Sequence, residues 1–307
     1  MSRNIAIAAK NISKWFGAFR AVDDLTFDVY SGEVFAMLGP NGAGKSTSIR
    51  MILDILKPDT GSIHVLGGPI NDKRKDRIGY LPEERGLYRS VPVLEMMTYL
   101  GALKGLSPTE ARRRSMSYLE RLGLAEHAKK KVSELSKGMQ QKVQFAVTVL
   151  HDPDLIIIDE PFSGLDPLNT MIVKELMLEF KARGGAVVMS THQMNQVEEM
   201  AERLLMIDRG QLALYGPVEE VRSRYALPAV QVEGQGDWAQ LSGVERVEVG
   251  ENGRRGMLLF LKPGTRPDDV LAEIATRPDM QIRRFELAVP NLTEIFIQVV
   301  QEGKYHA

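Results

Sequence analysis

The sequence contains no cysteine among its 307 residues, which excludes a disulfide framework, a thiolate metal site and a cysteine nucleophile. It also lacks an excess of charge of one sign, because 39 Lys and Arg offset 40 Asp and Glu to a net charge of −1. A protein whose main task is to bind nucleic acid usually carries a basic surface, so we do not expect that task. No apolar run approaches the roughly 18 residues that cross a bilayer, and the N-terminus lacks the apolar segment of a secretory signal. We therefore expect an intracellular protein without a membrane span.

Strands and helices alternate along the first two thirds of the chain. Apolar alternation and compact apolar runs predict strands over residues 5–8, 25–29, 33–38, 155–158 and 186–189. A helical repeat of apolar residues predicts a helix over 47–56, ended by Pro58 and Gly61. The section 88–150 is helical and holds no good strand. This alternation predicts an α/β fold with a parallel sheet and crossover helices.

The composition shifts near residue 225, which predicts a domain boundary there. We expect one domain over 1–225 and a small α+β domain over 229–307. Within the second domain, the pattern predicts strands over 229–233, 244–249, 257–262 and 281–287, with a helix over 267–276 and a last amphipathic helix from Leu292. That order indicates a ferredoxin-like unit.

A glycine-rich loop lies between the predicted strand 33–38 and the predicted helix 47–56. Residues 39–46 read GPNGAGKS and match the pattern G-x-x-x-x-G-K-[ST]. Glycines let successive backbone N–H groups turn toward phosphate, and the following helix adds its positive N-terminal end. Lys45 would then reach the β- and γ-phosphates, and the Ser46 hydroxyl would ligate Mg²⁺. The sequence therefore predicts a nucleoside triphosphate site rather than a flexible turn.

Two carboxylates follow the apolar strand at 155–158. Asp159 suits the shell of Mg²⁺, and Glu160 suits a base or water-orienting group for attack on the γ-phosphate. Alone, the pair reads more simply as an acidic end to a buried strand. Together with the phosphate loop, it predicts a site for ATP hydrolysis.

Several further segments stand in a familiar order, and with them the chain resembles the ATP-binding subunit of an ABC transporter. The segments are Walker A over 39–47, LSKGMQQK over 135–142 as the signature, Walker B over 155–160, SGLD over 163–166 as the D-loop, and His192 after the strand AVVMS. The resemblance is strongest to the ABC-2 group, related to bacterial sodium and drug efflux systems. It implies a P-loop NTPase of the ABC type, with a parallel-sheet core, an antiparallel β subdomain and a helical subdomain over about 88–150.

The resemblance also assigns roles to individual residues. It makes Glu160 and His192 catalytic, Asp166 a coupling residue of the dimer, and Ser46, Asp159 and Glu83 ligands of Mg²⁺. An aromatic face suits stacking on adenine, which is the role implied for Phe16, with a place in the core as the alternative. The implied nucleotide-binding residues are Phe16, Gly39, Asn41, Gly42, Ala43, Gly44, Lys45, Ser46, Thr47, Ser136 and Gly138.

Two motifs depart from the pattern of the family. Lys137 and Met139 replace Gly and Gln in the signature, but Ser136 and Gly138, which would hold the γ-phosphate of an opposite subunit, are present. Glu83 stands where the family has a glutamine after Tyr-Leu-Pro. An ionised carboxylate can ligate Mg²⁺ but cannot donate a hydrogen bond.

The chain carries one set of these motifs, that is, one ATP-binding cassette. The resemblance therefore implies a second ATP-binding subunit, with two ATP molecules sandwiched in a head-to-tail dimer. The resemblance further implies a separate transmembrane permease, export as the direction, and a place on the cytoplasmic face of the membrane. Two alternatives stay open here. One is a non-transport ABC ATPase acting on ribosomes or DNA, although two cassettes or a long coiled-coil insertion are absent. The other makes 229–307 a ligand-sensing or dimerisation module that the ATPase serves.

Overall fold

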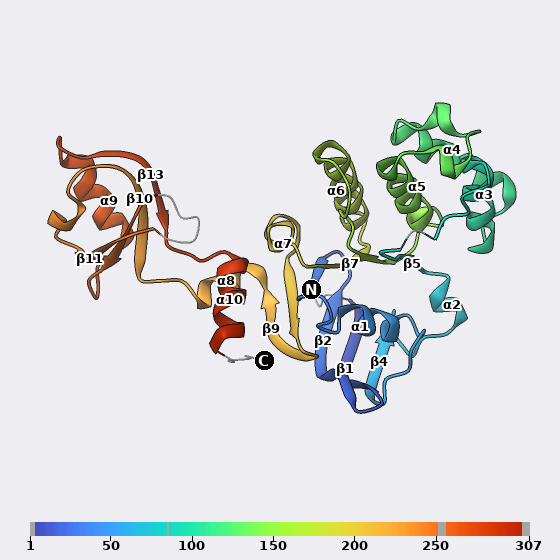
Figure 1. Ribbon diagram of the computed structural model, residues 1–307, viewed down its shortest axis with the longest axis horizontal. Helices are drawn as coiled ribbons and strands as arrows, with labels where there is room; N and C mark the ends of the chain where they lie inside the picture. The colour runs from blue at the N-terminus through green and yellow to red at the C-terminus, as the bar shows by residue number, and fades with distance from the viewer. Residues whose placement is uncertain (1–3, 85, 251–255, 303–307) are drawn as a thin grey trace. The chain divides into compact units, whose positions relative to one another are not determined.

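The computed structural model describes residues 4–84, 86–250 and 256–302. The chain divides after Pro217 into two compact units, whose described residues are 4–217 and 218–302 (Figure 1). Helix α8 (Val218–Arg224), whose residues precede the boundary expected near residue 225, belongs to the second unit. No helix in the described ranges combines the length and the apolar character needed to span a membrane.

A six-stranded sheet forms the centre of the first unit, with the strand order β5-β6-β7-β3-β8-β9. Its strands are β3 (Val34–Leu38), β5 (Ile78–Leu81), β6 (Leu155–Asp159), β7 (Ala186–Thr191), β8 (Arg203–Asp208) and β9 (Gln211–Pro217). Every residue of β3, β6 and β7 is buried, as expected for strands covered on both faces. The carboxyl ends of these three neighbours therefore meet at one edge.

The expectation of a parallel core is right for five strands and wrong for the sixth. Strand β9 runs antiparallel to β8, so the sheet is mixed. Arg209 and Gly210, which connect the two strands, both have positive φ, at 48° and 81°. A two-residue turn of this kind can join only antiparallel strands.

A separate antiparallel sheet in the first unit has the order β2-β1-β4, from β1 (Ile5–Phe16), β2 (Phe19–Tyr30) and β4 (Thr60–Val65). Strands β1 and β2 are longer than predicted because bulges carry the pairing past polar residues that break the alternation. The pairing runs to Phe16 and Phe19, which face each other across the turn at Gly17. This hairpin places both aromatic rings at one end of the sheet.

The helices of the first unit include the predicted helical section. They are α1 (Lys45–Ile52), α2 (Asp72–Lys75), α3 (Val93–Leu103), α4 (Pro108–Arg121), α5 (Lys137–Val149), α6 (Pro167–Ala182) and α7 (Met194–Met200), with short 3-10 turns at Ala125–His127 and Val132–Glu134. Helix α1 ends four residues earlier than predicted. Asp54 adopts a φ of 61°, a left-handed conformation that stops the helix.

The second unit holds a four-stranded antiparallel sheet with the order β11-β12-β10-β13. Its elements after α8 are β10 (Ala229–Gln235), a 3-10 turn at Trp238–Gln240, β11 (Val244–Val249), β12 (Met257–Leu261), α9 (Pro267–Thr276), β13 (Gln281–Leu287) and α10 (Leu292–Glu302). Trp238, Val270 and Ile274 pack with Val232 and Leu259 of the sheet in one core. The predicted strands and helix of this region are present within a few residues of their expected bounds.

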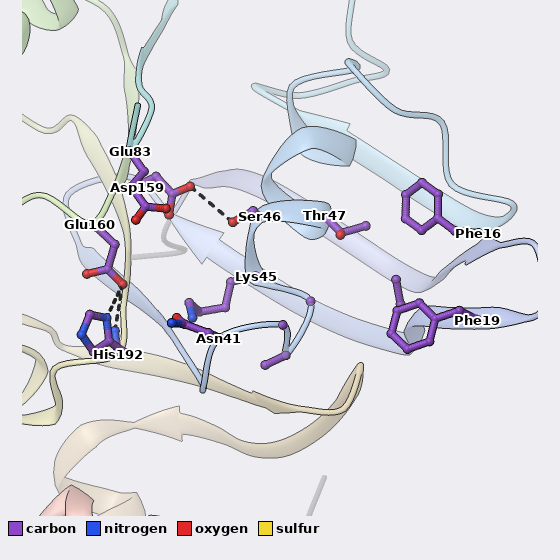
Figure 2. Close-up of a pocket in the computed structure, with 14 residues that line it drawn as sticks. Phe16, Phe19, Asn41, Lys45, Ser46, Thr47, Glu83, Asp159, Glu160 and His192 are labelled. Atoms are coloured by element: carbon purple, nitrogen blue, oxygen red, sulfur yellow. Dashed lines mark hydrogen bonds and ion pairs between the residues drawn. The ribbon is translucent and has the colours of Figure 1, made fainter. Parts of the chain in front are cut away.

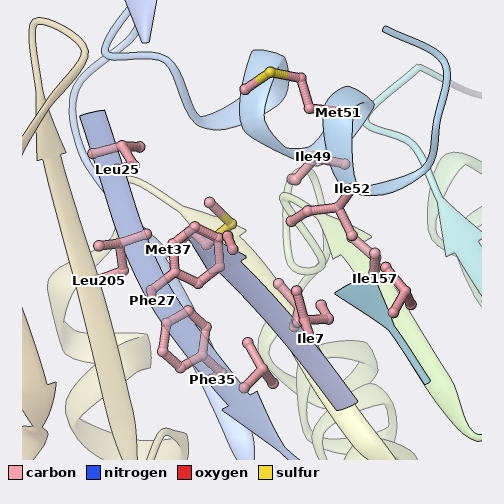
Figure 3. Packing of buried hydrophobic residues seen from close by; sticks show 14 of the residues in the cluster. Ile7, Leu25, Phe27, Phe35, Met37, Ile49, Met51, Ile52, Ile157 and Leu205 are labelled. Atoms are coloured by element: carbon pink, nitrogen blue, oxygen red, sulfur yellow. The ribbon is translucent and has the colours of Figure 1, made fainter. Parts of the chain in front are cut away.

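The hydrophobic core of the first unit joins the two sheets and helix α1 (Figure 3). Phe27 of β2 stacks on Phe35 of β3, with ring centroids 5.9 Å apart and an interplanar angle of 11°. Ile49 and Ile52 of α1 are fully buried in the same cluster. The helix that follows the phosphate loop is thus held by apolar contacts on its inner face.

Replacing Phe27 with alanine should lower the free energy of unfolding of the first unit by about 3–5 kcal/mol, because it removes a fully buried ring and leaves a cavity. Urea unfolding followed by circular dichroism measures this loss. Ile55→Ala, at a position that is 61% exposed, is the matched control and should change stability by less than about 0.5 kcal/mol. Equal effects of the two substitutions would contradict the assignment of the core.

Candidate nucleotide-binding site

The phosphate loop connects the end of β3 to the start of α1, and its glycines are sterically required. A Cβ at Gly39 would lie 2.2 Å from the backbone oxygen of Ile207, and one at Gly44 would lie 2.6 Å from that of Ala21. Both glycines have positive φ, at 151° and 114°. No larger residue fits either position without moving backbone, so the sequence pattern has a direct structural cause.

Lys45 lies at the first position of α1, and its side chain turns back into the loop. Its Nζ donates hydrogen bonds to the carbonyl oxygens of Gly39 at 2.7 Å and Pro40 at 3.2 Å. Burial lowers the pKa of this amine, while the carboxylates of Glu160, Asp159 and Glu83 act in the opposite direction. The ammonium therefore stands between the loop and a group of acids.

Asp159 ends strand β6 opposite the start of α1. Its Oδ2 accepts a hydrogen bond from the Ser46 hydroxyl at 3.4 Å, and Oδ1 accepts one from the Ser190 hydroxyl of β7. Strand pairing fixes this arrangement, because Asp159 is the registered partner of Ser190. The two oxygens of Ser46 and Asp159 are the hard ligands that Mg²⁺ prefers.

Glu160 follows Asp159 with a φ of 49°, which turns its side chain toward the same edge of the sheet. Its Oε1 lies 2.7 Å from Nδ1 of His192 and accepts from the His192 backbone N–H at 3.1 Å. Its Oε2 accepts from the Thr191 hydroxyl at 3.3 Å. The carboxylate is thus held by Thr191, the last residue of β7, and by His192, which follows the strand (Figure 2).

These residues line one pocket of about 450 Å³, drawn in Figure 2. The lining brings together most of the residues predicted from the sequence. They are Phe16, Asn41, Gly42, Ala43, Gly44, Lys45, Ser46, Thr47, Glu83, Asp159, Glu160 and His192. Gly39 lies just outside the lining and contributes through its carbonyl contact with Lys45.

Phe19 and Ala21 also line the pocket, and the sequence analysis missed them. Phe19 is the cross-strand partner of Phe16, and both rings are well exposed, at 63% and 49%. The turn at Gly17 between two strand-like segments is the signal that could have paired them. The aromatic side of the pocket is therefore a pair of rings rather than a single one.

Besides Gly39, three predicted residues lie outside this pocket: Ser136, Gly138 and Asp166. Ser136 is exposed and caps α5 by accepting from the backbone N–H of Met139 at 3.3 Å. Asp166 caps α6 by accepting from the backbone N–H of Asn169 at 2.9 Å, a bond that lowers its pKa. A Cβ at Gly138 would lie 3.2 Å from the same Asn169 side chain, so the signature and the D-loop are neighbours.

Comparison with known proteins agrees with this geometry. The ABC transporter family profile matches residues 22–163, and the profile of the ATP-binding protein DrrA1-3-like, C-terminal domain, matches residues 216–300. The chain is 39% identical to the uncharacterized ABC transporter ATP-binding protein YhaQ of Bacillus subtilis (strain 168), over 94% of this chain and 97% of that protein.

Two further relatives carry names that refer to resistance or export. The linearmycin resistance ATP-binding protein LnrL of Bacillus subtilis (strain 168) is 36% identical over 71% of each chain. The Nod factor export ATP-binding protein I of Sinorhizobium fredii (strain NBRC 101917 / NGR234) is 32% identical over 96% of this chain and 86% of its own length.

Solved structures share the fold of the first unit. An ATP-binding subunit of an ABC transporter superposes with a TM-score of 0.67 at 33% identity, covering 72% of this chain and 93% of its own. The ADP conformation of MJ1267, an ATP-binding cassette, gives 0.63 at 27% identity, covering 70% and 92%. With the phosphate loop, the paired carboxylates and the near full-length relatives in agreement, the chain belongs to the ATP-binding proteins of ABC transporters and is the ATP-hydrolysing subunit of such a transporter.

Proposed function

We propose that this subunit drives export through a separate transmembrane permease, and that it works on the cytoplasmic face of the membrane. The names of the linearmycin resistance and Nod factor export relatives support export. The proposed role in ATP hydrolysis rests on one observation. A single pocket is lined by Lys45, Ser46, Asp159, Glu160 and His192.

We propose that the triphosphate lies along the phosphate loop, with Lys45 on its β- and γ-phosphates and the adenine at the aromatic pair. The backbone N–H groups of the loop and the N-terminal end of α1 supply fixed positive dipoles for the phosphates. Phe16 offers an exposed π-face for the base, and Phe19 stands beside it. Asn41 of the loop and Thr47 of α1 also line the pocket.

Mg²⁺ would be held by Ser46 and Asp159, together with Glu83, which lines the same pocket. The donor set fits, because the Ser46 and Asp159 oxygens already lie 3.4 Å apart. In the described residues no group of three or more His, Cys, Asp or Glu could hold a metal alone, so phosphate oxygens would complete the ligands. When bound, Mg²⁺ neutralises charge on the phosphates.

Glu160 is the proposed base. A water beside the γ-phosphate gives up its proton to the Glu160 carboxylate while its oxygen attacks phosphorus, and the bond to the β-phosphate oxygen breaks to release ADP. The contacts to Thr191 and His192 orient this carboxylate before the reaction. His192, whose Nδ1 lies 2.7 Å from Glu160 Oε1, would contact the same γ-phosphate.

We propose that the active form is a head-to-tail dimer that sandwiches two ATP molecules. Ser136 and Gly138 stand at the N-terminal end of α5 but outside their own pocket, and Ser136 is exposed. A hydroxyl and free backbone N–H groups at a helix N-terminus suit a phosphate supplied by a second copy. Asp166, adjacent to Gly138 through Asn169, would couple the two sites.

We propose a ferredoxin-like fold for the second unit, with an interaction or regulatory role. Its strand order, β13-β10-β12-β11, corresponds to strands 4-1-3-2 of a β-α-β-β-α-β unit, which is the ferredoxin-like order. A 3-10 turn at Trp238–Gln240 stands in place of the first helix. The expected domain limits of 1–225 and 229–307 remain predictions.

Glu160→Gln should reduce ATP hydrolysis by at least about a hundredfold, because the amide cannot take a proton from water. ATP affinity should remain near the value of the unaltered chain, and the variant should accumulate as an ATP-bound dimer. Phosphate release, ATP titration and light scattering measure the three properties. The control is Glu84→Gln, an exposed acid outside the pocket, and unchanged hydrolysis by Glu160→Gln would exclude the assigned base.

Lys45→Ala should weaken ATP binding by about tenfold or more, since it removes the cation that contacts the phosphates. The loop also loses its two internal hydrogen bonds from Nζ. Fluorescence titration with ATP measures the change in Kd. Lys57→Ala, at an exposed position outside the pocket, should leave the Kd unchanged, and equal affinities for all three proteins would reject the proposed phosphate contact.

A further inference from the structure

Helix α5 buries polar side chains on the face that it turns toward the central sheet. Gln141, Gln144 and Thr148 are 6%, 5% and 5% exposed. Buried amides are costly unless they find partners, and apolar residues would pack such a face at lower cost. Two glutamines at these positions therefore call for a reason other than packing.

The partners of the two amides lie in the two loops that carry acids of the nucleotide pocket. Nε2 of Gln144 donates to the carbonyl oxygen of Pro82 at 3.5 Å, and Nε2 of Gln141 donates to that of Pro161 at 3.5 Å. Pro82 directly precedes Glu83, and Pro161 directly follows Glu160. Each glutamine thus contacts the carbonyl oxygen of a proline that is the sequence neighbour of a pocket carboxylate.

Helix α5 packs closely against strand β5 of the sheet. Gly79 of β5 has no side chain, and a Cβ there would lie 2.3 Å from the backbone oxygen of Thr148. Strands β5 and β6 are parallel neighbours with Leu81 registered on Ile158, so both loops leave the same edge of the sheet. One helix can therefore reach both loops.

The surroundings of Gln144 lower the stability of the folded chain. Its Oε1 is buried and has no hydrogen-bond partner within the part of the chain that the structure describes. A buried unsatisfied acceptor costs about 1–3 kcal/mol. A residue kept at such a cost marks a position where function outweighs stability.

We propose that Gln141 and Gln144 are positioning residues that attach the loops bearing Glu160 and Glu83 to helix α5. This inference rests on the proposed roles of those two carboxylates. The same helix begins at Ser136, in the signature, and rises roughly 12 Å from there to Gln144. A displacement of the signature end would therefore move both pocket loops together, through two backbone carbonyls.

Gln144→Met tests the proposal, because methionine keeps the length of the side chain and removes the amide. We expect kcat for ATP hydrolysis to fall by about tenfold while KM for ATP stays within about twofold, since the Glu83 loop loses its position but the phosphate loop is unchanged. We also expect the melting temperature to stay the same or rise, since the unsatisfied Oε1 is gone. Gln141→Met is the second variant and should lower kcat in the same way.

Thr148→Val is the matched control. It lies on the same buried face, and its hydroxyl donates only to the Gln144 carbonyl of its own helix, at 2.9 Å, so kcat should stay within about twofold of the unaltered chain. The proposal is overturned if both methionine variants keep the unaltered kcat, if Thr148→Val loses as much activity as they do, or if kcat falls only together with the melting temperature. An unaltered chain that does not hydrolyse ATP would overturn the proposed function and this inference together.

Discussion

The hydrogen bonds from the Lys45 ammonium to the carbonyls of Gly39 and Pro40 are the interaction on which the site depends. They close the phosphate loop on itself and keep a buried cation facing three carboxylates. The start of the loop lies close to the neighbouring strand, because a Cβ at Gly39 would fall 2.2 Å from the backbone oxygen of Ile207. Ser46, one residue further along α1, donates a hydrogen bond to Asp159 at the end of β6.

The central sheet assembles the rest of the site by register alone. Strands β3, β6 and β7 end side by side, so the loop shares one pocket with the two acids and His192, which lie more than a hundred residues further along the chain. Ser190 and Thr191 in β7 hold Asp159 and Glu160 respectively. The strand beside Walker B is thus as important for the orientation of the acids as Walker B itself, which is a consequence of parallel strands ending at one edge.

Local patterns predicted what depends on local chemistry. The phosphate loop, the buried strand before Asp159 and the strands of the second unit follow from spacing and composition. Long-range geometry was not accessible in the same way: the antiparallel β9 depends on a two-residue turn, and Phe19 enters the pocket through strand pairing. The glutamines of α5 carry no pattern that separates them from an ordinary amphipathic helix, because their partners are backbone carbonyls in two distant loops.

Glu160 combines a left-handed backbone, with φ at 49°, and a side chain that the proposed chemistry requires. Glutamate is seldom found in that conformation, whereas asparagine, aspartate and glycine adopt it more readily. Its backbone N–H donates to Ser190 at 3.0 Å, so the turn is held by the neighbouring strand rather than by its own preference. Replacing Glu160 with glycine or asparagine would therefore relieve the backbone conformation and, under the proposed role, remove the base. Selection for thermal stability alone would remove the residue, and selection for turnover would restore it.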